Sequence, residues 1–405
     1  MNRKSELSIR RKHPWIFSGN LSSAASSFIN GEWLTLFSTE NKPLATGIYS
    51  NTGLIAIRVV QFHPEFSKEK IRENLVSALR RRDELKKTTN AYRILHGEND
   101  FFPGITIDRL NQTWVVRIYS SSLQSYGRWI VWNLYDLCKS SKIGEPLPKR
   151  ILLDPPEKTG EDKKVVERFW RGKESNFYKN DSLLIRETVF LQKVKFPIEL
   201  PGQKGGIFLD LRNLRKFILK RTDLSKNKNC LHLFSHTGLT SICMDTAGAA
   251  SVTSVDGSKE ALDGFQRVLS LKKEKSFCKH RFLQKNLFQE LEDVLIDRKF
   301  GLIVIDPPNL TPDAKSKTSA LKSYSYLFGN CLSSLEESGT IILCSCSGRI
   351  RSEELESLAK KILNTQGWKF ETFHNLDPEA DHPVRKNFPE GNYFKVHIYE
   401  NCKKS

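Results

Sequence analysis

The feature that most constrains the fold is an apolar run that ends in an acid and two prolines, Phe300-Gly-Leu-Ile-Val-Ile-Asp306-Pro307-Pro308-Asn309. Five residues ahead of Asp306 are apolar and three of these are β-branched, which predicts a strand covered on both faces. Neither proline can donate to a continuing ladder, so we expect the strand to end at Asp306.

A second apolar run, residues 341–343, precedes Cys344-Ser345-Cys346-Ser347-Gly348. In open α/β sheets, ligands bind beyond the carboxyl ends of the strands. We therefore expect the carboxylate of Asp306 and the thiol of Cys346 to share one crevice.

Length and charge limit the class of protein. The chain has 405 residues, 39% of them apolar, which is enough for two or three domains with ordinary cores. Its 64 Lys and Arg residues outnumber 46 Asp and Glu residues, for a formal net charge of +18. Such an excess is typical of proteins that bind a polyanion, most often nucleic acid. The basic residues are spread along the chain, so the charge indicates a kind of partner and no site.

The eight cysteines show no C-x-x-C spacing and no accompanying histidine cluster, so we expect no metal. Polar residues follow Met1 where a secretion signal would be apolar, and no apolar run approaches the about 20 residues that span a bilayer. We therefore expect reduced thiols, a cytoplasmic protein and no membrane partner. The sequence leaves open whether the chain forms a homodimer.

Three stretches of different pattern predict three domains. Residues 1–65 carry short β-prone runs separated by turn-forming residues, which predicts a small β-barrel; the runs are 33–37, 45–49 and 55–60. Residues 66–195 mix both patterns and predict a central α+β domain, with helices at 68–87 and 124–138 and strands at 114–119 and 182–190. A second acid with two prolines, Asp154-Pro155-Pro156, is interpreted as the end of an ordinary strand. From residue 196 onward strands alternate with helical patterns, which predicts an α/β domain with a parallel sheet covered by helices.

The α/β domain contains a strand, a glycine-containing turn, a helix, a second strand and an acid. The strands are predicted at 229–234 and 251–256, with Gly238 in the turn and Asp256 at the end. A glycine lets a ligand approach the backbone, the following helix amides attract negative charge, and a carboxylate can accept both hydroxyls of a ribose. One glycine does not make a dinucleotide site. A nucleoside with an amino-acid tail, such as S-adenosylmethionine (SAM), fits better.

Together these motifs resemble the PUA-domain RNA methyltransferases of the ribosomal large-subunit methyltransferase I type, which form 5-methylcytosine in large-subunit ribosomal RNA. The resemblance covers nearly the whole chain. The matching strings are His13-Pro-Trp-Ile-Phe-Ser-Gly19, Leu44-Ala-Thr-Gly-Ile-Tyr-Ser50, Pro103-Gly-Ile-Thr-Ile-Asp-Arg109, Gly202-Gln-Lys-Gly-Gly-Ile-Phe-Leu-Asp210-Leu-Arg212, Asp381-His-Pro-Val384 and Phe388-Pro-Glu-Gly-Asn-Tyr-Phe-Lys395, besides the loops of Asp306 and Cys346.

The resemblance implies a Rossmann-like methyltransferase domain at 196–405 behind a PUA-like domain at 1–65 and a central domain at 66–195. It implies a SAM site made by Phe208, Asp210, Phe234, Ser235, Thr237, Gly238, Asp256, Asn286 and Asp306. This chain departs from the family pattern at three kinds of position. Asn286 replaces a residue that is usually acidic, Leu239 replaces a common glycine, and His232 and His236 replace other polar or aromatic residues.

Carbon 5 of cytosine is too weak a nucleophile to take a methyl group from SAM unaided. A thiolate that adds to carbon 6 raises its electron density, and the family's catalytic loop matches the string that contains Cys346. Asp306 is expected to hydrogen-bond ring nitrogen 3 and the exocyclic amine, with Pro307 and Pro308 stiffening the loop. Cys344 is interpreted as a second, releasing thiol or as a small buried side chain.

Three residues are expected to contact RNA. Trp15 lies in a basic and aromatic stretch that could stack on bases, or could pack in a core. His382 and Arg385 lie in the last matching segment and could equally be solvated surface residues.

Two other functions stay open at this stage. An Asp-Pro-Pro loop can also hold an exocyclic amine for methylation without a thiol, and mapping the methyl group by mass spectrometry and bisulfite conversion would separate the two reactions. Alternatively the chain binds RNA and has lost turnover, because Tyr324-Ser-Tyr326-Leu-Phe-Gly329 lacks the lysine and asparagine that the family usually places there. Binding of SAM and labelling of bulk RNA would test this alternative.

Overall fold

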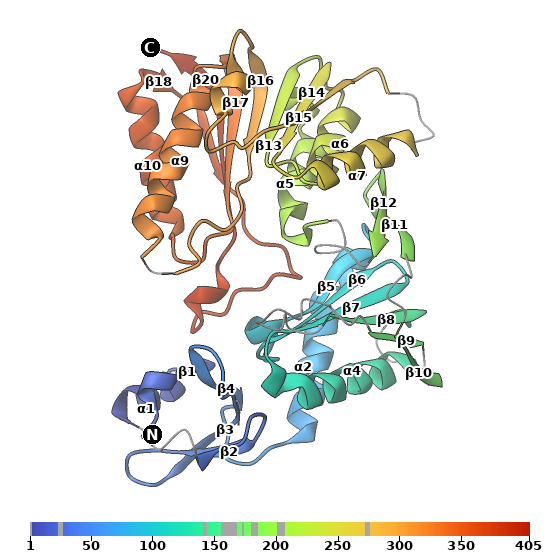
Figure 1. The fold of residues 1–405 in the computed structure, drawn as a ribbon, viewed down its shortest axis with the longest axis vertical. Coiled ribbons are helices and arrows are strands. Elements are labelled where there is room, and N and C mark those ends of the chain that lie inside the picture. Colours follow the sequence, from blue (N-terminus) through green and yellow to red (C-terminus); the bar gives the residue numbers. More distant parts are fainter. Residues whose placement is uncertain are drawn as a thin grey trace. The chain divides into compact units, whose positions relative to one another are not determined.

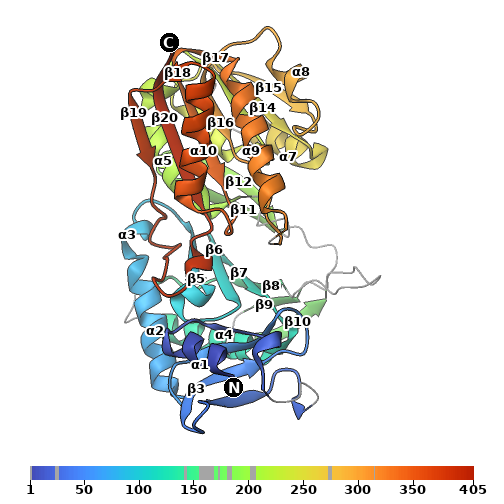
Figure 2. The same cartoon turned by 90° about the vertical axis from the view of Figure 1, so that its left-hand side faces the viewer.

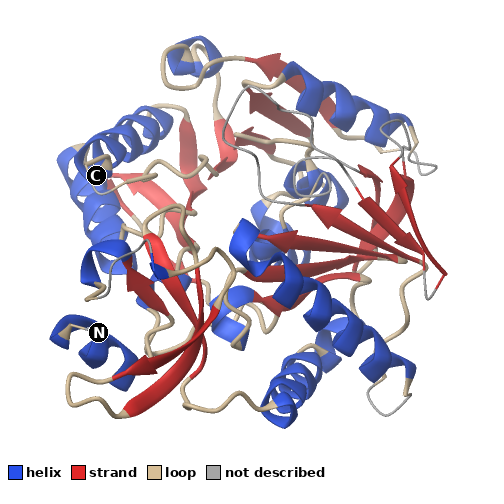
Figure 3. Cartoon of the chain, turned by 60° about the horizontal axis from the view of Figure 1, so that its bottom comes forward, coloured by secondary structure: helices blue, strands red, loops and turns tan. Residues whose placement is uncertain are grey.

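The structure is a computed structural model that describes residues 2–22, 27–140, 144–154, 168–171, 174–179, 185–200, 207–271, 276–313 and 315–405. Helices flank the strands (Figure 3). The chain divides into two compact units. Unit 1 comprises Met1–Val189, Glu199–Pro201 and Ala380–Gly391, and unit 2 comprises Phe190–Ile198, Gly202–Glu379 and Asn392–Ser405.

The N-terminal part of unit 1 is a four-stranded antiparallel sheet in the order β1-β4-β3-β2. The three β-prone runs of the sequence form its last three strands, so these predictions are confirmed. Its core is apolar and includes Ile16, Tyr49 and Ile57. The elements are α1 (Arg3–Arg10), β1 (Trp15–Phe17), β2 (Trp33–Phe37), β3 (Pro43–Tyr49) and β4 (Ile55–Gln61).

The rest of unit 1 contains a six-stranded sheet in the order β10-β9-β8-β7-β6-β5. The predicted strand at 114–119 and helix at 124–138 are observed as β7 and α4. The elements are α2 (Lys68–Arg81), α3 (Asp83–Lys86), β5 (Ala91–His96), β6 (Ile105–Leu110), β7 (Thr113–Ile118), α4 (Gln124–Lys139), β8 (Arg150–Asp154), β9 (Arg168–Arg171) and β10 (Glu174–Lys179). β8 ends at Asp154, as predicted, and Pro155 and Pro156 lie outside the described residues.

The helical stretch predicted at 68–87 is confirmed over residues 68–81 and 83–86, but it is divided at Arg82 into α2 and α3. The side chain of Arg82 is buried, and its guanidinium donates to the carboxylate of Asp100 and to the carbonyls of Ala78 and Arg93. Two of these partners, Arg93 and Asp100, lie on other segments, so the inward-pointing arginine does not follow the apolar periodicity of α2.

A hairpin of β11 (Ile185–Leu191) and β12 (Val194–Leu200) contains the strand predicted at 182–190, of which residues 182–184 are not described. Unit 2 contains an eight-stranded sheet in the order β15-β14-β13-β16-β17-β20-β18, with β19 paired to β20 at its outer edge (Figure 2). The strands from β15 to β17 are parallel, and β20 is antiparallel to β17.

Helices cover both faces of this sheet: α5, α6 and α7 lie on one face, and α9 and α10 on the other (Figure 1). The predicted parallel sheet covered by helices is thus confirmed. The elements are α5 (Arg212–Lys220), β13 (Asn229–Leu233), α6 (Leu239–Thr246), β14 (Ser251–Asp256), α7 (Lys259–Ser270), β15 (Lys279–Gln284), α8 (Leu291–Leu295), β16 (Phe300–Ile305), α9 (Lys317–Leu332), β17 (Leu335–Ser345), α10 (Ser352–Thr365), β18 (Trp368–Lys369), β19 (Thr372–Asn375) and β20 (Lys395–Lys404).

The register of the parallel strands fixes which residues meet at the sheet edge. Val255, Leu233, Ile305 and Leu343 are paired across four neighbouring strands. Because all four strands run in the same direction, the residues that follow them emerge side by side.

Candidate active site

The loops after β16 and β17 meet at this edge. Asp306 follows the wholly buried strand β16, and its backbone N–H donates to the carbonyl of Leu233 on the next strand at 3.3 Å. The thiol of Cys346 donates to the carbonyl of Pro307 at 3.7 Å. The structure therefore brings the acid loop and the cysteine loop together, as expected from the sequence.

Two side chains, those of Tyr324 and Lys395, hold the cysteine loop in place. This role was not predicted for them from the sequence. The hydroxyl of Tyr324 donates to the Oγ of Ser345 at 2.9 Å and lies 3.3 Å from the Oγ of Ser347. The ammonium of Lys395 donates to the carbonyls of Ser347, at 2.7 Å, and Tyr393, at 3.2 Å. Both side chains are buried, and burial lowers the pKa of Lys395 to about 8. Together they bond to Ser345 and Ser347, the residues on either side of Cys346.

The two cysteines of the loop lie in different environments. Cys344 is within β17, pairs with Val396 and has no exposed surface, so burial raises the pKa of its thiol well above the usual value. Cys346 lies beyond the strand and is partly exposed. Cys344 thus packs as a small core side chain, and of the two cysteines only Cys346 has exposed surface.

The turn between β13 and α6 has a left-handed backbone at three residues. Phe234 has a φ of 60°, His236 of 47° and Gly238 of 79°. A Cβ atom on Gly238 would lie 2.2 Å from the ring of Phe265. From the sequence, this glycine is expected only because it lets a ligand approach the backbone. That reason is incomplete, because the left-handed φ and a packed phenylalanine ring both require a glycine.

Asp256 holds the same turn in place. Its carboxylate accepts hydrogen bonds from the backbone N–H groups of His236 and Ser258, each at 2.8 Å. It also lines a hollow of about 550 Å³ together with Phe234, Asn286, Phe288 and Pro308. The amide of Asn286 is already hydrogen-bonded to the N–H of Phe288 and to the side chain of Gln289. Its contact with an adenine stays a prediction.

Phe234 also lines a second, smaller recess. It is lined by further residues of the predicted SAM site, namely Phe208, Ser235, Thr237, Gly238 and Asp306. Asp210 lies close by and accepts a hydrogen bond from the hydroxyl of Tyr393 at 2.8 Å. The Oγ of Ser235 is buried and has no hydrogen-bond partner within the described part of the chain. A polar atom of this kind, among strained turn residues, fits a ligand with polar groups such as the amino-acid part of SAM.

The predicted RNA contacts belong to unit 1. Trp15 donates from Nε1 to Glu98 at 2.8 Å, and its ring packs edge-on against Phe388. His382 is only 4% exposed and lies against His96 and Asp381. Arg385 donates to the carbonyls of Glu98 and Lys12. Each side chain has a structural role, and its contact with RNA stays a prediction.

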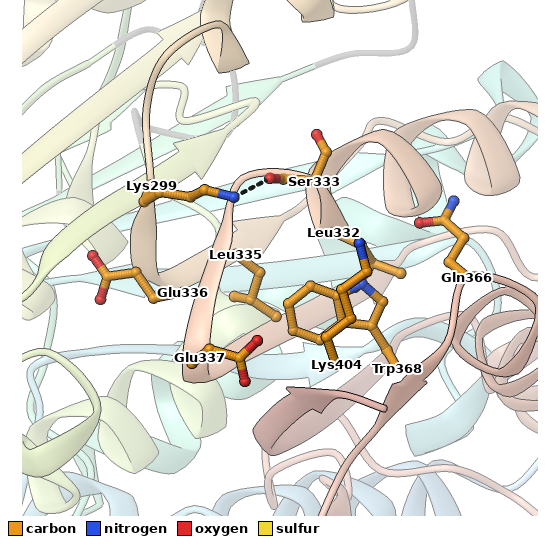
Figure 4. A pocket seen from close by; sticks show the side chains of 9 residues that line it. All are labelled: Lys299, Leu332, Ser333, Leu335, Glu336, Glu337, Gln366, Trp368 and Lys404. Atoms are coloured by element: carbon orange, nitrogen blue, oxygen red, sulfur yellow. Dashed lines mark hydrogen bonds between the residues drawn. The ribbon is translucent and has the colours of Figure 1, made fainter.

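Two other features of unit 2 lie outside this site. Asp245, Cys278 and His280 bring potential metal ligands within 4.8 Å of one another, so the expectation of no metal stays untested. A hollow of about 570 Å³ at the opposite end of the sheet is lined by Lys299, Leu335, Trp368 and others, with the ammonium of Lys299 bonded to the carbonyl of Ser333 (Figure 4). Since β16 and β17 begin there, this hollow is remote from Asp306 and Cys346.

Comparisons with known proteins agree with this geometry. Residues 1–62 match the model of the PUA-like domain. A SAM-dependent methyltransferase from Streptococcus mutans superposes with a TM-score of 0.77 at 19% identity, over 98% of each chain. A methyltransferase solved in complex with S-adenosylhomocysteine gives 0.76, also at 19% identity and 98% coverage of each chain. The fold and the site thus define a SAM-dependent methyltransferase with a PUA-like N-terminal domain.

Sequence identity to known proteins shows which family of SAM-dependent methyltransferases the chain belongs to. The chain is 30% identical over 397 residues to ribosomal RNA large subunit methyltransferase I of Escherichia coli strain SMS-3-5, covering 96% of both chains. The protein of the same name from Serratia proteamaculans is 27% identical, again with 96% coverage of both. The chain belongs to the ribosomal RNA large subunit methyltransferase I family. None of the helices in the described residues is long and apolar enough to cross a membrane.

Proposed function

We propose that this chain methylates carbon 5 of a cytosine in large-subunit ribosomal RNA, with Cys346 as the nucleophile that activates the base. The observation that carries the proposal is the contact between the two loops. The thiol of Cys346 lies 3.7 Å from the carbonyl of Pro307, directly after Asp306. A base held by the Asp-Pro-Pro loop would therefore present its ring to the thiol.

Cys346 and Asp306 have different roles in the proposed methyl transfer. The thiolate of Cys346 forms a bond to carbon 6, and the ring electrons shift to carbon 5. Asp306 accepts a hydrogen bond from the exocyclic amine and, as the carboxylic acid, donates one to nitrogen 3, which orients the base and stabilises the negative charge of the adduct. SAM supplies the electrophilic methyl group. Loss of the carbon 5 proton to a base and expulsion of the Cys346 thiolate restore the aromatic ring.

The surroundings of Cys346 favour the thiolate form of its side chain over the thiol. Lys395 is buried beside the loop, and a positive charge there stabilises a negative sulfur. The polar side of the SAM site is provided by the turn from Phe234 to Gly238, and Asp256 ends the strand where a ribose is expected. The cytoplasmic location and the individual SAM contacts predicted above are part of this proposal.

Methyl transfer to ribosomal RNA from a strain that lacks this protein tests the proposal. We expect one 5-methylcytosine, located by bisulfite sequencing. Cys346→Ala should lower turnover by about 10³-fold or more and leave SAM affinity nearly unchanged. Cys278→Ala, at the other partly exposed cysteine, is the matched control and should keep full activity.

A covalent test separates this reaction from amine methylation. RNA with 5-fluorocytidine at the target cannot lose a proton from carbon 5, so the wild-type chain should remain bonded to it through Cys346 and Cys346→Ala should not. Undiminished turnover in Cys346→Ala, or a methyl group on an exocyclic amine, would contradict the proposal.

A further inference from the structure

Unit 1 contains a hollow of about 600 Å³ that is lined in part by Phe101, a phenylalanine with a left-handed backbone. Its wall combines the end of the PUA-like segment, the start of α2 and the loop after β5. Two phenylalanines, Phe62 and Phe101, line it together with polar and charged side chains, among them Lys12, Lys70 and Asn74.

Phe101 is held in a conformation that disfavours a large side chain. Its φ is 68° and its ψ 27°, at the end of a short 3-10 helix, Gly97–Asp100. Its side chain is nonetheless 38% exposed, whereas the next residue, Phe102, is fully buried. Phe102 anchors the backbone by donating to the carbonyl of Gly97 at 2.9 Å. The fold therefore bears a strained backbone to present an aromatic ring at the surface, as is common at binding sites.

A fixed positive charge lies over this ring. The guanidinium carbon of Arg385 is 4.1 Å from the ring centre of Phe101 and 5.7 Å from that of Phe62. The guanidinium donates to the carbonyls of Glu98 at 2.8 Å and Lys12 at 3.0 Å, and the backbone N–H of Arg385 donates to Asn99. With its position set by three hydrogen bonds, Arg385 needs no reordering when a ligand binds.

The remaining wall suits a nucleotide. Lys12 is exposed and makes no ion pair with a described residue, so its ammonium is available to a phosphate. Asn74 offers an amide, and Glu65 a carboxylate, to the hydrogen-bonding edge of a base. The carboxylate would repel a phosphate inside the hollow. This charge pattern favours an inserted base with its phosphates at the rim.

We propose that this hollow binds an unpaired base of single-stranded RNA, stacked on the Phe101 ring that Arg385 supports. The inference rests on the proposed function only in taking RNA as the substrate. Exposed aromatic rings beside fixed guanidinium groups bind unstacked bases, whereas bases inside a duplex cannot enter such a site.

Titration of fluorescent single-stranded RNA at several salt concentrations tests the proposal. Phe101→Leu keeps an apolar side chain under the same backbone constraint and removes the aromatic ring. It should weaken affinity for single strands by about 5- to 100-fold at every salt concentration. Its affinity for a duplex of the same length should be unchanged. Lys12→Ala should instead make the dependence of log affinity on log salt shallower by about 0.7.

Two further variants make the test decisive. Phe277→Leu alters a fully exposed phenylalanine of unit 2 and should bind like wild type. Phe101→Trp keeps a stacking ring and should retain affinity even if Phe101→Leu lowers the melting temperature. Binding of a base in this hollow is refuted if wild type binds single strands and Phe101→Leu binds them equally. It is also refuted if Phe101→Trp loses as much affinity as Phe101→Leu. In both cases the methyl-transfer proposal stands. A wild-type chain that neither binds nor methylates any RNA refutes the proposed function itself.

Discussion

The two ends of α6 allow a direct measurement of why the turn after β13 requires a glycine. Gly238 precedes the helix and Gly248 follows it, with φ values of 79° and 93°. An alanine at either position must adopt a conformation that costs about 1 to 2 kcal/mol. At Gly238 the new Cβ also lies 2.2 Å from the Phe265 ring, whereas at Gly248 its nearest neighbour is Lys226 at 3.5 Å. The two substitutions therefore differ in steric overlap and share the conformational cost.

Phe265 cannot move away cheaply, because its side chain is fully buried against its neighbours. Overpacking in such a position costs about 1 to 3 kcal/mol. We therefore expect Gly238→Ala to destabilise unit 2 by about 2 to 5 kcal/mol and Gly248→Ala by about 1 to 2 kcal/mol. Urea unfolding followed by hydrogen exchange in peptides from α6 and α7 measures unit 2 alone.

A double mutant separates the two costs. In a Phe265→Ala background the overlap is absent, so Gly238→Ala should lose only the conformational part, and the coupling energy should equal the steric part. SAM affinity should fall in Gly238→Ala and be kept in Gly248→Ala. Equal destabilisation by the two single substitutions, with no coupling to residue 265, would refute the claim that ring packing demands this glycine.

Three further predictions follow from buried charges and thiols. The pKa of Lys395 is lowered to about 8, so as the pH rises the folded state releases this proton before the unfolded state does. We therefore compare the unfolding free energy of wild type with that of Lys395→Met. The difference should be constant below pH 8 and should rise in favour of wild type by up to about 3 kcal/mol toward pH 10.5. A flat difference over the whole range, measured by urea unfolding, would contradict the burial of that charge. Asp100→Asn leaves the buried guanidinium of Arg82 without its carboxylate and should destabilise unit 1 by about 3 to 5 kcal/mol, as read from exchange in α2 peptides. Iodoacetamide should label Cys346 and Cys278 in the folded chain and spare the six buried cysteines, and mass spectrometry that finds Cys344 labelled as fast as Cys346 would show that β17 opens.

Elements with a local pattern were predictable from the sequence. The strand before Asp306 is β16, its six residues all buried, because a run of β-branched and apolar residues that ends in prolines fits few other structures. The strand ending at Asp256 was likewise placed to the residue. The break at Arg82 was not predictable, because its partners Arg93 and Asp100 lie on other segments and leave no mark on helical periodicity.

The same distinction applies to the site. In the sequence, Lys395 is only the last residue of a matching string, and no role in the site was predicted for it, since a lysine at the start of a strand is usually solvated. Its role depends on β20 pairing antiparallel to β17, which places Lys395 opposite Ser345. The buried run that follows it, Val396 to Tyr399, is the local signal that this strand is central and that its first side chain could point inward.

Convergence of the acid and the thiol depends on strand order more than on either motif. In the sheet, β13 lies between β14 and β16, so Leu233 pairs with both Val255 and Ile305. In the sequence, β14 is instead followed by β15 and then by β16. This order places the turn after β13 beside Asp306 and the strand before Cys346 one step further on. With a different order the same motifs would emerge strands apart, and a thiol could not reach a base held at Asp306. Propensity and spacing cannot choose between these orders, because each strand is locally identical in all of them. The order entered the sequence analysis only through the family resemblance, and the 3.7 Å contact between Cys346 and Pro307 is the geometric consequence on which the thiol mechanism depends.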